Sequence, residues 1–226
     1  MSDYIELHSH STFSMLDGAS SPEALVTRAA ALGYRSLALT DHNGLYGAVR
    51  FWQAAKEQGI RPIIGAELVL ADGGHVTLLA ETEQGYANLC RLISAGQLAG
   101  QKGSPRLELE VLAAHALGLL CLSGCRLGAV PAALLAGEKE KACQVASWLR
   151  DLFGPDRFWL EVQRHYLPAD IRLVAALVKL AHRLDIGLVA TNNVHYAQRS
   201  GQWLHDVLTC IRHRTNLPEA LAGGLL

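Results

Sequence analysis

Short apolar runs alternate with amphipathic segments along most of this 226-residue chain. Such alternation is typical of βαβ units, in which helices cover a mostly parallel sheet. About seven strands are expected, and that number favours a closed or nearly closed barrel over an open sheet. The chain also lacks the glycine-rich loop that marks open nucleotide-binding sheets. The sequence therefore predicts an α/β barrel whose strands cover residues 4–8, 36–40, 62–69, 75–80, 117–122, 158–163 and 187–190.

Helices are expected between these strands. Ser21 suits an N-cap, Pro22 suits the first turn of the helix that follows, and Gly33 is well placed to end that helix. A loop is expected at 100–105, where glycine, serine and proline gather. The expected helices cover residues 22–32, 45–58, 86–98, 138–153, 169–184 and 201–212.

Composition limits the function classes. Half of the residues are apolar and 18% are charged, which excludes a disordered tail. The net charge of −1 argues against a protein that coats nucleic acid over its whole surface, although it is compatible with a local basic patch. The five cysteines form no CxxC pair, the N-terminus does not resemble a signal peptide, and the apolar runs are too short to span a bilayer. We therefore expect a soluble, cytoplasmic protein without a membrane partner.

Residue types that bind metals follow the predicted strands. In an α/β barrel the carboxyl ends of the strands open on one face, where active sites are built. Side chains at these ends are therefore expected to converge, even when they come from distant parts of the chain. The residues concerned are His8, His10, Asp41, His42, Glu67, Cys125, Asn193 and His195.

The chemistry of these residue types points to divalent cations. His8 and His10 alternate in an extended segment, so both imidazoles point the same way and offer a pair of ligands to zinc or another transition metal. Carboxylates such as Asp17 and Glu67 supply negative charge and can bridge two cations. A Cys125 thiolate would favour zinc. More than four ligands indicate a multinuclear site, which can activate water and clamp a phosphate.

Each of these residues also has an ordinary explanation. A His-X-His pair on a strand is more often incidental than a metal site. Asp41 could cap a helix, and Cys125 alone could be a small buried residue. His75 begins its strand instead of ending it, so it fits the strand-end pattern poorly. The metal-site interpretation therefore depends on the joint occurrence of these residues at one barrel face.

Several motifs resemble a known family. Leu7–Gly18, Leu39–Gly47 and Gly65–Glu67 resemble the PHP (polymerase and histidinol phosphatase) domain, above all the N-terminal PHP domain of bacterial C-family DNA polymerases, the alpha subunit of polymerase III. Glu161–His165 and Asp206–Arg212 are similar to the error-prone branch of these polymerases, which acts in damage-tolerant synthesis. The resemblance covers nearly the whole chain.

The resemblance implies a distorted (βα)7 TIM-like barrel, the PHP fold, as a single domain over residues 1–226. It also implies that the polymerase palm, fingers and thumb are absent from this chain, so the chain by itself should not polymerise DNA. Up to three divalent ions, zinc or manganese, are expected. Where the family commonly has an aspartate ligand this chain has Asn193, whose neutral amide is a weaker ligand. The other ligands that the resemblance implies are His8, His10, Asp17, His42, Glu67, His75, Cys125 and His195.

Three functions remain open. The first is the PHP domain of an error-prone polymerase in DNA replication and repair, with phosphoesterase or 3′–5′ exonuclease-like activity. A DNA 3′ end or single strand would then reach the metal mouth near Arg126 and Arg164, and the rest of a polymerase chain or accessory repair proteins would be partners. The second is a catalytically decayed, metal-stabilised platform for the polymerase or a partner. The third is a free-standing small-molecule phosphatase.

Overall fold

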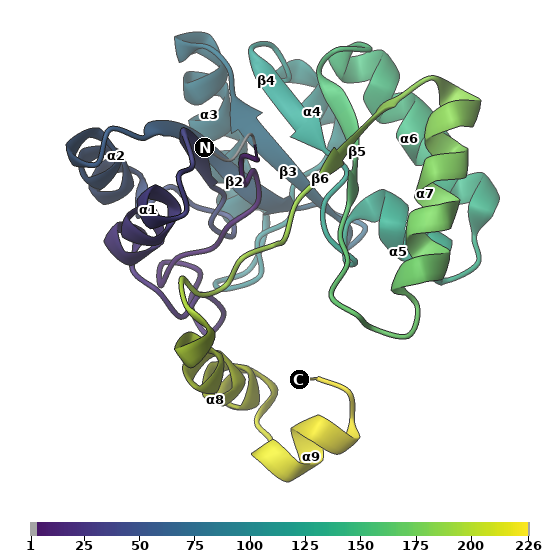
Figure 1. Ribbon diagram of the computed structural model, residues 1–226. Helices are drawn as coiled ribbons and strands as arrows, with labels where there is room; N and C mark the ends of the chain where they lie inside the picture. Colours follow the sequence, from purple (N-terminus) through teal and green to yellow (C-terminus); the bar gives the residue numbers. More distant parts are fainter. Residues whose placement is uncertain (1–3, 226) are drawn as a thin grey trace. The chain divides into compact units, whose positions relative to one another are not determined.

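The computed structural model describes residues 4–225, which divide into two compact units (Figure 1). Within the described residues, unit 1 consists of 4–42, Tyr46–Ile63 and 193–225, and unit 2 consists of Asn43–Leu45 and Ile64–Asn192. The strands of the described residues are hydrogen-bonded in the order β1-β2-β3-β4-β5-β6, which is also their order in the chain. The fold is therefore α/β with a six-stranded sheet, whereas the closed seven-stranded barrel and the single-domain boundary stay predictions.

Unit 1 begins its first helix where the sequence predicts. The Ser21 side chain accepts a hydrogen bond from the Ala24 amide, and Pro22 occupies the first turn. The next strand is buried at every position. The elements of unit 1 are α1 (Pro22–Ala31), β1 (Ser36–Leu39), α2 (Ala48–Glu57), the 3-10 helix η1 (Arg199–Gly201), α8 (Gln202–His213) and α9 (Leu217–Ala222).

Residues 4–8 do not form the strand that the sequence predicts. Glu6 and Ser9 make only isolated bridges to neighbouring segments. Side-chain hydroxyl groups make several of the hydrogen bonds between this segment and β1. The Ser9 amide donates to Thr40 Oγ1 (3.0 Å), Thr40 Oγ1 donates to the Ser9 carbonyl (3.1 Å), and Ser9 Oγ donates to the Ala38 carbonyl (2.5 Å). Backbone bonds persist only at separate points, such as the Ala38 amide to the Glu6 carbonyl (2.9 Å) and the Thr40 amide to the Ser9 carbonyl (2.8 Å), so the segment forms isolated bridges and no regular strand.

Unit 2 contains most of the sheet and the helices that cover it. In Figure 1, α6 and α7 (green) pack beside β4, β5 and β6, and α3 packs on β3 and β4. The short helices α4 and α5 are not among the expected ones. The elements are β2 (Arg61–Val69, which begins in unit 1), β3 (His75–Ala80), α3 (Glu83–Ala99), α4 (Leu109–Ala114), β4 (Leu119–Leu122), α5 (Ala129–Leu135), α6 (Lys139–Phe153), β5 (Phe158–Val162), α7 (Asp170–Leu184) and β6 (Gly187–Ala190).

The sheet of unit 2 is mixed, and the expectation of a mostly parallel sheet is wrong for its first part. β2 and β3 are antiparallel, as are β3 and β4, whereas β4, β5 and β6 are parallel. Residues 70–74 join β2 to β3, and the Leu70 amide closes this hairpin by donating to the Gly74 carbonyl (2.8 Å). A connection this short cannot cross over to a parallel strand.

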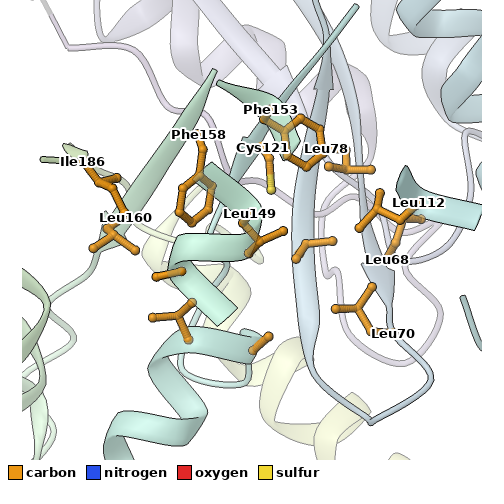
Figure 2. Close-up of a cluster of buried hydrophobic side chains, with 14 of the residues drawn as sticks. Leu68, Leu70, Leu78, Leu112, Cys121, Leu149, Phe153, Phe158, Leu160 and Ile186 are labelled. Atoms are coloured by element: carbon orange, nitrogen blue, oxygen red, sulfur yellow. The ribbon is translucent and has the colours of Figure 1, made fainter. Parts of the chain in front are cut away.

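The apolar core of unit 2 lies on one face of its strands (Figure 2). Leu68 and Leu78 enter it from β2 and β3, Phe158 from β5, and Leu149 from α6. Each of these side chains is almost fully buried, so each contributes about 1.5–3 kcal/mol of hydrophobic stabilisation. The core holds the strands in place and thereby fixes what their other face presents.

That other face carries buried polar residues. Side chains alternate along a strand, and the neighbours of Glu67, Thr77 and Glu161 belong to the core, so these three point away from it. All three are nonetheless buried. Buried carboxylates are costly unless they are hydrogen-bonded or bind cations, so this face is where a site is expected.

The first prediction concerns Asp170 at the start of α7. Its Oδ2 accepts from the backbone amides of His165 (2.7 Å) and Leu167 (3.1 Å), and its Oδ1 accepts from Arg126 (2.5 Å). Burial alone would raise the pKa of Asp170, but the two amide bonds and the Arg126 charge outweigh burial and lower it. The carboxylate therefore stabilises the fold above the ordinary aspartate pKa of about 3.9 and loses this effect as pH falls through the lower folded-state pKa.

We expect Asp170→Asn to lower the free energy of unfolding by about 1–3 kcal/mol at pH 7. The loss should shrink at the lowest pH at which the wild type stays folded. Urea unfolding at the two pH values measures both. Asp151, which is 67% exposed, supplies the control, since Asp151→Asn should change stability by less than about 0.5 kcal/mol. An equal loss from Asp170→Asn at both pH values would contradict the assignment.

Candidate metal centres

The first cluster lies in unit 1 and consists of His10, Asp17, His42 and His195. One ligand atom each from His10, Asp17 and His195 lie within 4.8 Å of one another. Asp17 Oδ2 is 3.1 Å from His42 Nε2 and 3.0 Å from His195 Nε2. The His10 ring stacks against the His42 ring at 4.3 Å and the His195 ring at 5.1 Å between centroids. Four of the predicted ligands are therefore brought together.

Two more predicted ligands border this cluster. His10 Nε2 is 3.1 Å from His8 Nε2 and 2.9 Å from Asn193 Oδ1. Asn193 has φ = +47°, a left-handed conformation that asparagine and aspartate adopt more readily than other non-glycine residues. The backbone therefore suits either side chain, and the amide oxygen stands where an aspartate would place a carboxylate.

A buried carboxylate organises the loop that carries the cluster. Asp41 accepts hydrogen bonds from the Ser11 amide (2.7 Å), Ser11 Oγ (2.8 Å) and Ser14 Oγ (2.7 Å). Ser14 Oγ in turn lies 3.3 Å from His10 Nδ1 and accepts from the His42 amide (3.1 Å). Burial raises the pKa of Asp41 against the effect of these bonds. Asp41 thus supports His10 and His42 and is not itself in a ligand group.

Gly18 is a steric requirement of the same loop. A Cβ atom at this position would lie 1.9 Å from the Ser11 carbonyl oxygen, far inside contact distance. The Gly18 amide donates to the Ser14 carbonyl (3.0 Å), which closes the turn that carries Asp17. The motif Leu7–Gly18 therefore ends in glycine, the one residue without a Cβ atom.

Asp17 is the electrostatic centre of the first cluster. Burial would raise its pKa, but hydrogen bonds from His195 and His42, and their charges, outweigh burial and hold the pKa of Asp17 well below its usual range. Arg212 also donates to Asp17 Oδ1. Asp17 is therefore an anion surrounded by nitrogen donors, an oxygen and nitrogen ligand set that fits zinc or manganese.

The second cluster lies in unit 2 and consists of Glu67, His75 and Cys125. One ligand atom of each lies within 4.8 Å of the others, and His75 Nδ1 is 2.7 Å from Glu67 Oε1. The antiparallel hairpin explains why His75 lies near Glu67. Val69 pairs with His75, so the start of β3 lies beside the end of β2. The strand-end pattern ranked His75 low because it assumed parallel strands, whereas the family resemblance implied that His75 is a ligand. The structure brings His75 to Glu67, and its role as a ligand stays a prediction.

Cys125 is suited to a metal more than to free thiolate chemistry. Burial raises the pKa of its thiol well above the usual range, and the charges of Glu67 and Glu161 raise it further. Without a cation the thiol stays protonated. A divalent ion beside it would favour the thiolate, and carboxylate, imidazole and thiolate together form a ligand set that fits zinc.

Glu161 is a buried carboxylate that the residue-by-residue reasoning missed. It follows the apolar residues of β5 and accepts hydrogen bonds from Thr191 Oγ1 and from Gln163 Nε2 (2.7 Å). The missed signal is a glutamate within an otherwise apolar strand, because such a position is buried by default and needs polar partners.

The two predicted phosphate contacts have partners within the protein. Arg126 pairs with the buried Asp170, and the Arg164 guanidinium lies 5.1 Å from the centre of the Tyr166 ring. Arg164 is exposed. Their contact with a phosphate stays a prediction, as does the convergence of all the predicted ligands at one barrel mouth.

Comparison with known proteins identifies the family. The PHP domain family model matches residues 6–165, so the chain belongs to the PHP domain family. It is 45% identical to an error-prone DNA polymerase of Mycolicibacterium paratuberculosis over 98% of the chain and 21% of that protein. It is 41% identical to a DNA polymerase III subunit alpha of Treponema pallidum over 94% of the chain and 19% of that protein. The chain thus spans about a fifth of the length of these relatives.

Solved structures support the fold. A proposed metal-dependent phosphoesterase from Bifidobacterium adolescentis matches with a TM-score of 0.56 and 16% identity, over 86% of this chain and 89% of that one. A lesion-specific endonuclease from Pyrococcus furiosus matches with a TM-score of 0.53 and 16% identity, over 86% of this chain and 48% of that one. In residues 4–225 no helix has the length and apolar character needed to cross a membrane.

Proposed function

We propose that this chain is the N-terminal PHP domain of an error-prone DNA polymerase and that its metal centre hydrolyses phosphoesters at nucleic-acid ends. The observation that supports this most is the grouping of ligand atoms in His10, Asp17 and His195 and again in Glu67, His75 and Cys125. Sequence kinship to error-prone polymerases supplies the nucleic-acid context. The single domain over residues 1–226 and a cytoplasmic location belong to the same proposal.

Zinc or manganese, up to three ions, is the proposed cofactor. The first cluster, with His8 and Asn193 beside it, and the second cluster would hold these ions. When bound, divalent ions activate water and stabilise charge that develops on phosphoryl oxygens. The protein's part is positioning: the Asp41 network orients His10 and His42, and the β2–β3 hairpin brings His75 to Glu67.

DNA is the proposed substrate, as a 3′ end or a single strand. The near-neutral net charge restricts binding to a local contact, for which Arg164 and Arg126 are the proposed phosphate contacts. The rest of a polymerase chain or accessory repair proteins are the proposed partners. The protein from Pyrococcus furiosus that shares the fold is named a lesion-specific endonuclease, which supports a nucleic-acid substrate.

The hydrolysis prediction uses a 3′-labelled single strand with added Mn²⁺ or Zn²⁺. We expect turnover by the wild type and a loss in His10→Ala larger than the roughly 10- to 100-fold cost of removing an outer-shell partner. His213→Ala, an exposed residue at the end of α8, is the matched control and should keep wild-type activity. Wild-type turnover no greater than that of His10→Ala would remove the catalytic proposal. Much faster hydrolysis of phosphomonoesters would favour a small-molecule phosphatase.

Asn193 favours a second candidate function, a metal-stabilised platform that has lost catalysis. Its neutral amide oxygen lies 2.9 Å from His10 Nε2, at the position where the family resemblance implies an aspartate ligand. An amide does not offset the charge of a cation, so an ion held there would be bound more weakly. Metal binding can still stabilise a fold without any reaction.

Asn193→Asp separates the two candidates. We expect Zn²⁺ to bind about tenfold more tightly, because a full negative charge is added beside His10 at a backbone position that aspartate tolerates. Calorimetric titration measures the affinity, and the 3′-labelled strand measures hydrolysis. Asn216→Asp at the N-cap of α9 is the control, since aspartate caps equally well. Activity gained only in Asn193→Asp supports the platform, and unchanged affinity contradicts a cation beside Asn193.

A further inference from the structure

Two side chains of helix α8 make hydrogen bonds to Asp17. Arg212 Nη1 donates to Asp17 Oδ1, and His205 Nδ1 lies 2.9 Å from the Asp17 backbone carbonyl oxygen. The two residues are seven positions apart, which is two helical turns, so they occupy the same face of α8. Thr209, between them on that face, is buried. One face of the helix therefore makes two hydrogen bonds to the same predicted ligand residue, Asp17.

The contact from His205 has a defined direction. A carbonyl oxygen only accepts hydrogen bonds, so Nδ1 of His205 carries the proton and donates. The His205 ring also lies 4.8 Å from the His195 ring between centroids. Burial lowers the pKa of His205, and the hydrogen bond to the Asp17 carbonyl opposes that effect. This is an outer contact to the metal-binding loop, made by a residue that is in none of the ligand groups.

The turn that carries Asp17 benefits from such support. Leu16, just before it, has φ = +60°, an uncommon conformation for a leucine, and Gly18 after it has no room for a side chain. Arg212 occupies Oδ1 and leaves Oδ2 directed at the imidazoles of His42 and His195. The contact from Arg212 thus holds the carboxylate so that its second oxygen faces the imidazoles of the cluster.

We propose that α8 is a clamp, in which His205 and Arg212 position Asp17 for cation binding and cation binding in turn orders α8. The inference rests on the proposed metal function. It adds that α8, which contributes no residue to the ligand groups, sets the affinity of the site for the cation. Outer-shell partners of metal ligands commonly set affinity through orientation. Coupling free energies are reciprocal. If the packing of α8 raises the affinity for the cation, then the bound cation stabilises α8 by the same free energy.

The test compares two substitutions at the same position. His205→Leu removes the hydrogen bond to Asp17, whereas His205→Asn keeps an N–H donor near the place of Nδ1. Zn²⁺ affinity, measured by competition with a chromogenic chelator, should fall about tenfold or more in His205→Leu and less than about threefold in His205→Asn. His213→Leu, an exposed histidine on the same helix, is the matched control and should bind Zn²⁺ like the wild type.

Hydrogen exchange of the α8 amides supplies a readout that a merely structural contact would not move. Zn²⁺ should slow exchange across α8 in the wild type and in His205→Asn, and much less in His205→Leu. Wild-type Zn²⁺ affinity in His205→Leu would overturn the clamp and leave the metal function intact. An equal loss in His205→Asn and His205→Leu would also overturn it. Absence of Zn²⁺ binding by the wild type would instead overturn the proposed metal function.

Discussion

The position of one oxygen atom organises unit 1. Asp17 Oδ2 lies about 3 Å from the Nε2 atoms of both His42 and His195, and Oδ1 is held by Arg212. A buried carboxylate needs this many donors to stay charged. The loop from Ser11 to Gly18, the Asp41 network and α8 all serve to place that carboxylate. These nitrogen groups keep the buried Asp17 carboxylate charged when no ion is present. The imidazoles among them and the carboxylate also form a ligand set for a divalent cation.

Unit 2 solves a related problem with different ligands. Its core fills one face of the strands, and alternation along the strands then forces Glu67 and Glu161 onto the other face. Their charges help to keep the buried Cys125 thiol protonated. A cation would reverse that preference, so a Cys125 thiolate beside these carboxylates is unfavourable without an ion and favourable with one.

Much of the fold and site follows from the sequence. The N-cap at Ser21 and the amphipathic spacing of the helices are local properties, and they predict α1, α2, α3, α6, α7 and α8. The residue types that follow the expected strands predict five members of the two clusters, namely His10, His42, Glu67, Cys125 and His195. The short helices α4 and α5, of six and seven residues, are too brief to show a period. The strand expected at 4–8 is reduced to isolated bridges, and its partners Leu37 and Val194 are distant in sequence, so local spacing could not predict how far the pairing extends.

The direction of β3 and the supporting contacts around the clusters depend on pairing between distant segments, which the sequence pattern does not show. Strand direction decides the role of His75, because only an antiparallel β3 brings it to Glu67. The supporting roles of Asp41 and His205 depend on contacts between segments far apart in the chain. Motif resemblance indicated His75 as a candidate ligand, which the strand-end pattern had ranked low. It indicated none of the supporting residues, since their roles are visible only as contacts.

The most direct test of the metal assignment is elemental analysis of the purified protein after dialysis against Zn²⁺ or Mn²⁺ and removal of free ions. The structure predicts at least about one tightly bound ion per chain, with less metal in Asp17→Asn and in Cys125→Ser, because each substitution removes a ligand from one of the two clusters. A wild-type protein that retains no transition metal would contradict the assignment, and so would variants that retain as much as the wild type.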